Sequence, residues 1–238
     1  MPSPSFSTAE RPVVIGHRGA SGHAVENSLE AFRIAASRGH PGSCHGVELD
    51  LQTTLDGEFV VHHDPALATG ELIAATPLSR VCATRLADGS PVPTLAAALA
   101  VLARLEVFVE AKTLPPAADA ALLALLHAHG PDRSSVHAFD HRVIARLHRA
   151  DPGLRLGVLS RSYPVDPVQQ VRDAGAAMLW QEAYLIDAPL VVACHDAGIA
   201  LIAWTVNETA EAQRLAELGV DGLCGNWPNR LRNSGRGP

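Results

Sequence analysis

Short runs of β-branched and aliphatic residues alternate with Ala- and Leu-rich segments along almost the whole chain. The β-type runs are residues 12–17, 46–52, 106–112, 135–139, 155–159, 176–180, 199–206 and 221–225. Apolar residues at helical spacing occupy most of the intervening segments, at residues 28–39, 94–105, 116–130, 141–150, 188–198 and 209–219. Eight strands that alternate with helices over this length predict an α/β fold, a (β/α)8 TIM barrel. An open, doubly wound sheet is the alternative architecture.

One long segment interrupts the alternation. Asp56-Gly57 is a turn signal, and residues 58–61 after it are predicted to form a short hairpin strand. Residues 64–93 are rich in Pro, Gly and Thr and are predicted to be an excursion, so the barrel has a small insertion after its second strand. We expect one domain over residues 12–228, a disordered N-terminus at 1–11 and a flexible tail at 229–238.

Composition limits the class of protein. A formal net charge of -6 and no block of Lys and Arg argue against nucleic-acid binding. Residues 1–12 lack the parts of a secretory signal, and no segment approaches the about 18 apolar residues of a membrane span. The four cysteines lie far apart, which favours reduced thiols over a zinc ribbon or redox pair. We therefore expect a cytoplasmic protein without stable membrane insertion, and its oligomeric state is left open.

Two carboxylates stand inside an apolar strand. Glu48 and Asp50 are two positions apart, so they project to one face while Val47, Leu49 and Leu51 project to the other. Adjacent like charges are unfavourable unless a cation or hydrogen-bond donors satisfy them, which makes the pair a candidate metal site. An exposed edge strand with solvated acids is the simpler explanation for such a pair by itself.

Polar groups also end the neighbouring strands. The first strand ends in His17-Arg18, the third ends in Glu110 and Lys112 on one face, and the hairpin strand is followed by His62 and His63. Active sites of barrels form at these carboxyl ends. Glu48, Asp50 and Glu110 make an all-oxygen site that suits Mg2+ or Ca2+. With a divalent ion, Arg18 and Lys112 would bring the net charge to about +1, which favours a phosphodiester monoanion as substrate.

These motifs, in this order, resemble the glycerophosphodiester phosphodiesterase family over nearly the whole chain, from about residue 13 to 228. The segments that carry the resemblance are His17-Arg18-Gly19, Glu26-Asn27-Ser28, Glu48-Leu49-Asp50, His63-Asp64, Glu110-Ala111-Lys112, Trp204-Thr205-Val206-Asn207, Asp221-Gly222 and Trp227-Pro228. The chain departs from the family pattern at the segment before Ser28, which lacks a Pro, at residues 94–99, which lack acidic residues, and at Asn226, where an Asp is common.

The resemblance implies a TIM barrel that hydrolyses glycerophosphodiesters to sn-glycerol 3-phosphate and an alcohol with a divalent metal. It implies that His17 and His63 are the acid/base pair. Of the neighbouring residues His62 and His63, the resemblance selects His63, because the family motif places its histidine immediately before Asp64. By the same resemblance, Arg18 and Lys112 would bind the substrate phosphate. The metal ligands would be Glu48, Asp50 and Glu110.

Weaker candidates accompany these residues. Glu26 and Asn27 are expected to brace the site, and Trp204 is expected either to pack at the barrel rim or to contact the glycerol of the substrate. Asn207 is predicted to cap the following helix. No role is assigned to the remaining histidines, which are His23, His40, His45, His127, His129, His137, His141, His148 and His195.

Several alternatives are left open. The nucleophile could be water or the glycerol 2-hydroxyl, and the alcohol of the substrate is not indicated. A lysophospholipase D-type phosphodiesterase would use the same residues with a more apolar pocket. A non-catalytic barrel that binds phosphorylated ligands would be expected to lack at least one of the histidines or carboxylates.

Overall fold

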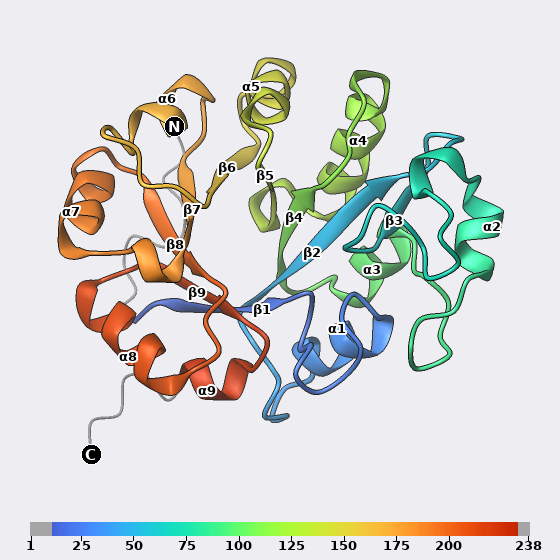
Figure 1. Ribbon diagram of the computed structural model, residues 1–238, viewed down its shortest axis with the longest axis horizontal. Helices are drawn as coiled ribbons and strands as arrows, with labels where there is room; N and C mark the ends of the chain where they lie inside the picture. The colour runs from blue at the N-terminus through green and yellow to red at the C-terminus, as the bar shows by residue number, and fades with distance from the viewer. Residues whose placement is uncertain (1–10, 233–238) are drawn as a thin grey trace.

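The computed structural model describes residues 11–232 and contains one closed barrel of parallel strands (Figure 1). The barrel strands are β1 (Val13–His17), β2 (Gly46–Thr53), β4 (Glu106–Ala111), β5 (Ser134–Ala138), β6 (Arg155–Ser160), β7 (Met178–Glu182), β8 (Ala200–Trp204) and β9 (Gly222–Gly225). Their ends agree with the predicted runs to within two residues. The predicted (β/α)8 fold is confirmed.

Closure of the sheet distinguishes the barrel from an open doubly wound sheet. β1 pairs in parallel with β9 on one side, where Ile15 lies opposite Cys224. On its other side β1 pairs in parallel with β2, where Ile15 lies opposite Gly46. The first and last strands of the barrel are therefore neighbours, and the carboxyl ends of all eight strands meet at one mouth.

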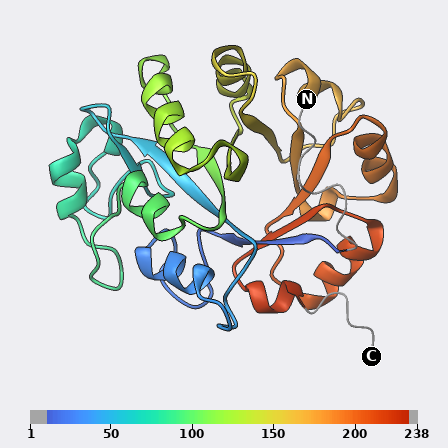
Figure 2. The same ribbon diagram turned by 180° about the vertical axis from the view of Figure 1, so that it is seen from behind.

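Helices surround the barrel on its outer side, as Figure 2 shows from behind. They are α1 (Leu29–Ala36), α3 (Leu95–Val101), α4 (Asp119–His129), α5 (His141–Ala150), α6 (Gln169–Asp173), α7 (Ala188–Asp196), α8 (Thr209–Leu218) and α9 (Pro228–Arg232). Short 3-10 turns η2 (Pro116–Ala118), η3 (Pro131–Arg133) and η4 (Ala183–Leu185) accompany them. Side chains that accept from first-turn amides begin four of the helices, namely Ser28, Thr94, Asp140 and Asp187.

Strand alternation divides the core into two layers. Residues such as Val47, Leu49 and Leu51 pack outward against the helices, whereas Phe108 and Trp180 fill the barrel interior. Small residues make room for these two rings. A Cβ at residue 46 would lie 2.7 Å from the Phe108 ring, and one at residue 157 would lie 2.9 Å from the Trp180 ring, so glycine is required at both positions.

The predicted insertion follows β2. It begins with β3 (Phe59–Val61), which pairs antiparallel with β2, and continues through η1 (Ile73–Ala75) and α2 (Leu78–Ala83). These elements lie to one side of the barrel in Figure 1. They bury a small apolar cluster of their own, which includes Val60, Ile73 and Val81. The excursion is therefore a packed unit rather than an extended loop.

The segment predicted to be a flexible tail begins within a helix. Residues 229–232 belong to α9, where Leu231 is buried and Arg232 donates to the Ser43 hydroxyl at 2.8 Å. Residues 1–10 and 233–238, which contain the rest of both predicted ends, lie outside the described residues. The helices within residues 11–232 are all too short or too polar to serve as membrane spans.

Candidate active site

Polar side chains from three neighbouring strands gather at the mouth of the barrel. His17 ends β1, Glu48 and Asp50 lie on β2, and Glu110 lies near the end of β4. The parallel register sets His17 opposite Glu48 and Asp50 opposite Glu110. Their positions along the strands are those that face the barrel interior. The strand register therefore produces the cluster of acids that the sequence predicts.

The chain turns sharply after β1. Arg18 and Gly19 have positive φ angles of 57° and 83°, and a Cβ at Gly16 would lie 2.8 Å from the carbonyl oxygen of Gly19. The turn directs the backbone amide of Arg18 to Glu48, whose Oε2 accepts its hydrogen bond at 2.9 Å. A left-handed backbone at a residue other than glycine is costly and occurs often at functional sites.

Asp50 is fully buried between cations and an amide donor. Its Oδ2 accepts from Asn27 Nδ2 at 2.7 Å and lies 3.1 Å from Arg18 Nε. Its Oδ1 lies 3.2 Å from Lys112 Nζ. Burial by itself would raise the pKa of this carboxyl, but Lys112 and Arg18 outweigh burial and hold the pKa below its usual range. Asp50 is therefore ionised and already compensated by protein groups.

Glu26 and Asn27 both contact the residues that the sequence places in the site. Arg18 Nη1 lies 2.9 Å from each oxygen of the Glu26 carboxylate. Asn27 has a φ of 56°, and its backbone amide donates to the backbone carbonyl of Arg18 at 3.0 Å. The two residues thus fix the Arg18 guanidinium and the Asp50 carboxylate in position.

Glu48 and Glu110 lack such complete compensation. Burial, followed by the charges of Asp50 and Glu110, raises the pKa of Glu48 well above its usual value. Burial and Asp50 likewise raise the pKa of Glu110, although Lys112 Nζ lies 2.6 Å from its Oε1. Glu48 Oε1 is buried and has no hydrogen-bond partner in the described part of the chain. A cation beside these two carboxylates would supply the missing charge.

His137, on β5, was not singled out by the sequence. It lies opposite Glu110 in the β4–β5 register and is 1% exposed. One ligand atom from each of Glu48, Glu110 and His137 falls within 4.8 Å of the others, which makes these three residues a group that could hold a metal ion. Asp50 is not part of that group. The alternation of inward- and outward-facing residues could have been followed one strand further, from β4 to β5. It would have revealed His137, since Glu110 and His137 are opposite each other and both face inward.

His17 is held by the segment that follows β9. Its Nδ1 lies 2.7 Å from Asn226 Oδ1, which can only accept, so Nδ1 carries the proton and Nε2 has a free lone pair. Burial and the nearby Arg18 lower the pKa of His17 to about 4, so the ring is neutral near neutral pH. Nε2 lies 4.0 Å from Glu48 Oε2. His17 therefore presents a proton acceptor beside the acids.

Asn207 takes part in this arrangement, and its predicted capping role is wrong. The N-cap of α8 is Glu208, and no side chain caps that helix. Asn207 Oδ1 instead accepts from the backbone amide of Asn226 at 2.9 Å. Because Asn226 contacts His17, Asn207 supports the histidine indirectly. The contact joins two loops that are distant in sequence, so local patterning could not show it.

The insertion brings His63 to the level of Asp50. The amide of His62 donates to the Asp50 carbonyl at 3.0 Å, and Gln52 Nε2 donates to the His63 carbonyl at 3.1 Å. His63 Nδ1 lies 2.8 Å from Asp64 Oδ1, and His63 is close enough to Asp50 to lower the pKa of that carboxyl. Nδ1 of His62 is instead engaged by the Asp64 carbonyl at 3.0 Å. Of the two histidines, only His63 has its Nδ1 paired with a carboxylate.

Comparison with known proteins assigns the chain to a family. The sequence model of the glycerophosphoryl diester phosphodiesterase family matches residues 17–230. The chain belongs to this family. The glycerophosphodiester phosphodiesterase of Caldanaerobacter subterraneus subsp. tengcongensis is 27% identical over 240 residues, covering 94% of this chain and 97% of the relative. The predicted resemblance is confirmed, and the chain is a phosphodiesterase of the phosphoric diester hydrolase class.

Solved structures have the same fold as this phosphodiesterase. A proposed glycerophosphoryl diester phosphodiesterase of Silicibacter pomeroyi superposes with a TM-score of 0.85 at 26% identity, covering 94% of this chain and 92% of the other. A phosphodiesterase of Oleispira antarctica, in complex with the product sn-glycerol-3-phosphate, superposes with a TM-score of 0.84 at 24% identity and covers 94% and 96% of the two chains. The second likeness concerns the fold alone.

Trp204 lies on the opposite side of the phosphodiesterase mouth, at the end of β8. Its ring packs against the interior cluster, and its Nε1 is buried without a partner among residues 11–232. The guanidinium carbon of Arg161 lies 5.2 Å from this ring and 5.3 Å from the ring of Phe139. Phe139 is 43% exposed. Trp204 thus packs at the barrel rim, which was one of the two expectations for it. With Phe139 it also forms an aromatic wall of the mouth.

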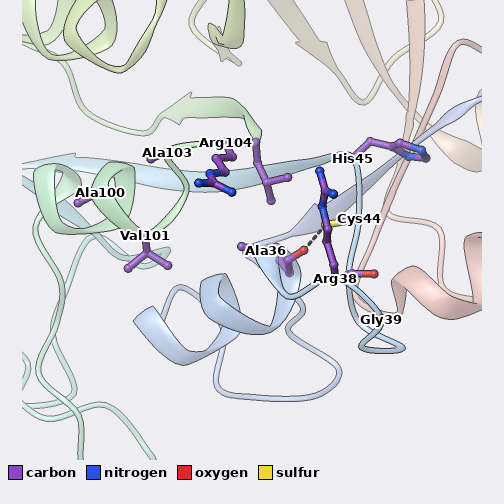
Figure 3. A pocket seen from close by; sticks show the side chains of 12 residues that line it. Ala36, Arg38, Gly39, Cys44, His45, Ala100, Val101, Ala103 and Arg104 are labelled. Carbon is purple, nitrogen blue, oxygen red and sulfur yellow. Dashed lines mark hydrogen bonds between the residues drawn. The ribbon is translucent and has the colours of Figure 1, made fainter.

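A cavity of about 670 Å³ lies at the other end of the barrel. Figure 3 shows it between the segment after α1 and the end of α3, with Arg38 and Arg104 beside it. These segments lead into the amino ends of β2 and β4. None of the residues that the sequence assigns to catalysis, phosphate binding or metal binding lines this cavity.

Proposed function

We propose that this phosphodiesterase hydrolyses glycerophosphodiesters to sn-glycerol 3-phosphate and an alcohol, with a divalent metal ion and histidine acid/base catalysis. The observation that carries the proposal is the convergence of three carboxylates, two cations and a neutral imidazole at one barrel mouth, with His17 Nε2 4.0 Å from Glu48 Oε2. Family membership supports the same reaction.

Glu48, Asp50 and Glu110 are proposed to hold the metal ion, with Mg2+ and Ca2+ as the ions that suit oxygen ligands. The buried, unpartnered Oε1 of Glu48 and the raised pKa values of Glu48 and Glu110 fit a divalent cation. When bound, such an ion supplies positive charge to the nonbridging oxygens of the phosphate.

Arg18 and Lys112 are proposed to bind the substrate phosphate. Both are charged, because Asp50 and the neighbouring glutamates raise their pKa values against the opposing effect of burial. Each already contacts an acid of the site, so its cationic group is fixed before substrate arrives. Such fixed charges stabilise the additional negative charge that develops on phosphorus during attack.

The two histidines are proposed to divide the proton transfers. His17 is neutral, with its Nδ1 proton bound by Asn226, so Nε2 accepts the proton of the nucleophile. His63 then donates a proton to the departing alcohol, with Asp64 orienting its ring. The nucleophile is either water or the glycerol 2-hydroxyl, which would form a cyclic phosphate first.

A coupled assay for sn-glycerol 3-phosphate tests the proposal. We expect release from glycerophosphocholine and glycerophosphoethanolamine when the purified protein is supplied with a divalent ion. A lysophospholipid is the third substrate, and its hydrolysis is followed by release of the free alcohol, because its phosphate-bearing product is lysophosphatidic acid. Inorganic phosphate release is the control for a monoesterase. Hydrolysis of none of the three substrates would contradict the proposal and favour a non-catalytic barrel that binds phosphorylated ligands.

Lysophospholipase D-type activity is a second candidate, and exposed apolar side chains around the mouth favour it. Phe139, Tyr163, Val165 and Tyr184 follow β5, β6 and β7, at the carboxyl ends of these strands. Their exposed fractions are 43%, 41%, 108% and 68%. Such residues could contact an acyl chain. Release of the alcohol from the lysophospholipid, with no sn-glycerol 3-phosphate from either glycerophosphodiester, would select this candidate over the first.

Asn226→Asp is expected to shift the pH profile of kcat/KM. A carboxylate next to His17 Nδ1 stabilises the imidazolium, so the pKa of His17 rises from about 4. His17 then loses its proton only at higher pH, and the acid limb of kcat/KM moves upward by about one unit or more. The control is Asn229→Asp on α9, which adds the same charge beside a different histidine, His23. An unchanged acid limb would show that His17 is not the titrating base.

A further inference from the structure

We propose that His137 is a further metal ligand, which binds the ion together with Glu48 and Glu110. The resulting site has both nitrogen and oxygen ligands, and it prefers a first-row transition metal ion, such as Mn2+ or Zn2+, to Mg2+ or Ca2+. The inference deepens the metal site of the proposed function and rests on it. It concerns which ion the mouth selects, and its test measures binding without reference to catalysis.

Geometry places the imidazole with the carboxylates. One atom of each of the three side chains lies within 4.8 Å of the other two, so the three residues form a group that could hold a metal ion. All three side chains are buried, with His137 at 1% and Glu48 at 2% exposure. Glu110 and His137 are direct neighbours in the β4–β5 register. Two rigid parallel strands therefore fix the distance between these two ligands.

Packing fixes the orientation of the His137 ring. The ring stacks on Trp180 with centroids 4.1 Å apart and planes 7° apart, and Phe108 packs edge-on against the same tryptophan at 5.3 Å. Gly157 leaves the space for this stack, since a Cβ there would lie 2.9 Å from Trp180 and 3.2 Å from the His137 Cβ. A ligand held by packing in this way is preorganised for binding.

Nδ1 of His137 has no hydrogen-bond partner among residues 11–232 that would explain its burial. Glu48 Oε1 is in the same condition. Burying polar atoms without partners is costly. A metal ion would satisfy a nitrogen of one and an oxygen of the other. Asp50 Oδ1 also lacks a hydrogen bond among residues 11–232, but Lys112 Nζ lies 3.2 Å from it, so a cation already stands beside this oxygen.

The donor set determines the choice of ion. Mg2+ and Ca2+ are hard ions that take oxygen ligands, whereas imidazole is a common ligand of transition metals. With Asp50 from the proposed function, the donor set is three carboxylates and one imidazole, and the added imidazole favours Mn2+ or Zn2+. Lys112 contacts Oε1 of Glu110, and the second carboxylate oxygen of Glu110 allows lysine and ion to share this residue.

The test is metal binding to the full chain after removal of metal by a chelator. Isothermal titration with Mn2+, Zn2+, Mg2+ and Ca2+ is expected to give at least about tenfold tighter binding of the two transition metals. His137→Phe keeps a ring to stack on Trp180 but removes the nitrogens, and it should lose about tenfold or more in affinity for Mn2+ and Zn2+ with little change for Mg2+. His127→Phe, at an exposed position on α4 paired with Asp151, is the matched control.

A measurement on the unmodified protein keeps the inference testable if His137→Phe does not fold. Electron spin echo spectra of the Mn2+ complex should show modulation from a directly bound nitrogen. Its absence, or equal affinities of the unmodified protein and His137→Phe for Mn2+, would overturn the inference. If nitrogen-ligated Mn2+ is found but no diester yields sn-glycerol 3-phosphate, the proposed function fails and this inference stands.

Discussion

Replacing His17 by Ala is expected to lower kcat for glycerophosphodiester hydrolysis by about 10² to 10⁴-fold, the usual contribution of a general acid or base. The ring is neutral and its Nδ1 proton is bound by Asn226, so the variant loses the Nε2 lone pair that accepts the proton of the nucleophile. His63→Ala is expected to give a loss of similar size because the leaving alcohol then departs without a proton. Steady-state kinetics with the coupled assay measures both effects.

The adjacent histidine provides a matched control for this experiment. His62→Ala removes an imidazole whose Nδ1 contacts the Asp64 carbonyl, and we expect activity to fall by less than about threefold. Circular dichroism and thermal unfolding should show that all three variants fold. Full activity of His17→Ala or His63→Ala would refute the corresponding role, and a large loss in His62→Ala would show that the wrong histidine was assigned.

Removing the divalent ion is expected to reduce activity by about 10² to 10³-fold, because several kcal/mol of transition-state stabilisation are lost with its charge. Exhaustive treatment with EDTA followed by readdition of metal measures this effect. Glu48→Gln keeps an acceptor for the Arg18 amide but removes a negative charge, so it should weaken metal binding and lower kcat/KM even at high metal concentration.

Glu58→Gln is the control for the loss of charge, because Glu58 is exposed on the hairpin turn after β2. It should retain the activity and metal response of the unmodified protein. Retention of full activity after metal removal, confirmed by elemental analysis, would eliminate the metal from the proposed mechanism.

The increase in melting temperature that the ion causes should also be greater at about pH 8 than at about pH 5, since Glu48 and Glu110 must lose their protons to bind it.

Local sequence patterns were sufficient for the architecture. The alternation of β-type and helical runs predicts the barrel because side-chain periodicity depends only on the element in which a residue lies. The same rule places Glu48 and Asp50 on the interior face and Val47 and Leu49 against the helices, as the structure shows. The local pattern did not indicate α9 at residues 229–232, because its anchor, Leu231, is buried by tertiary packing.

Contacts between distant segments could not be predicted in this way. Asn226 approaches His17 across 209 residues of sequence, and Asn207 positions Asn226 from a third segment. The motif resemblance identified Asn226 as a departure from the family pattern but could not show which group it contacts. His137 escaped notice because the inward-facing positions were followed only as far as β4, although the β4–β5 register sets His137 opposite Glu110.

By itself, the sequence determined that eight strands carry their acids and imidazoles at one end, because each strand's two faces are set by the order of its own residues. The tertiary structure alone decided which of these groups compensate one another. Lys112 and Arg18 form ion pairs with Asp50, while Glu48 Oε1 and His137 Nδ1 are buried without a hydrogen-bond partner among residues 11–232. The physical reason is that charge compensation depends on distance and burial, which arise only when the barrel closes and removes the site from water.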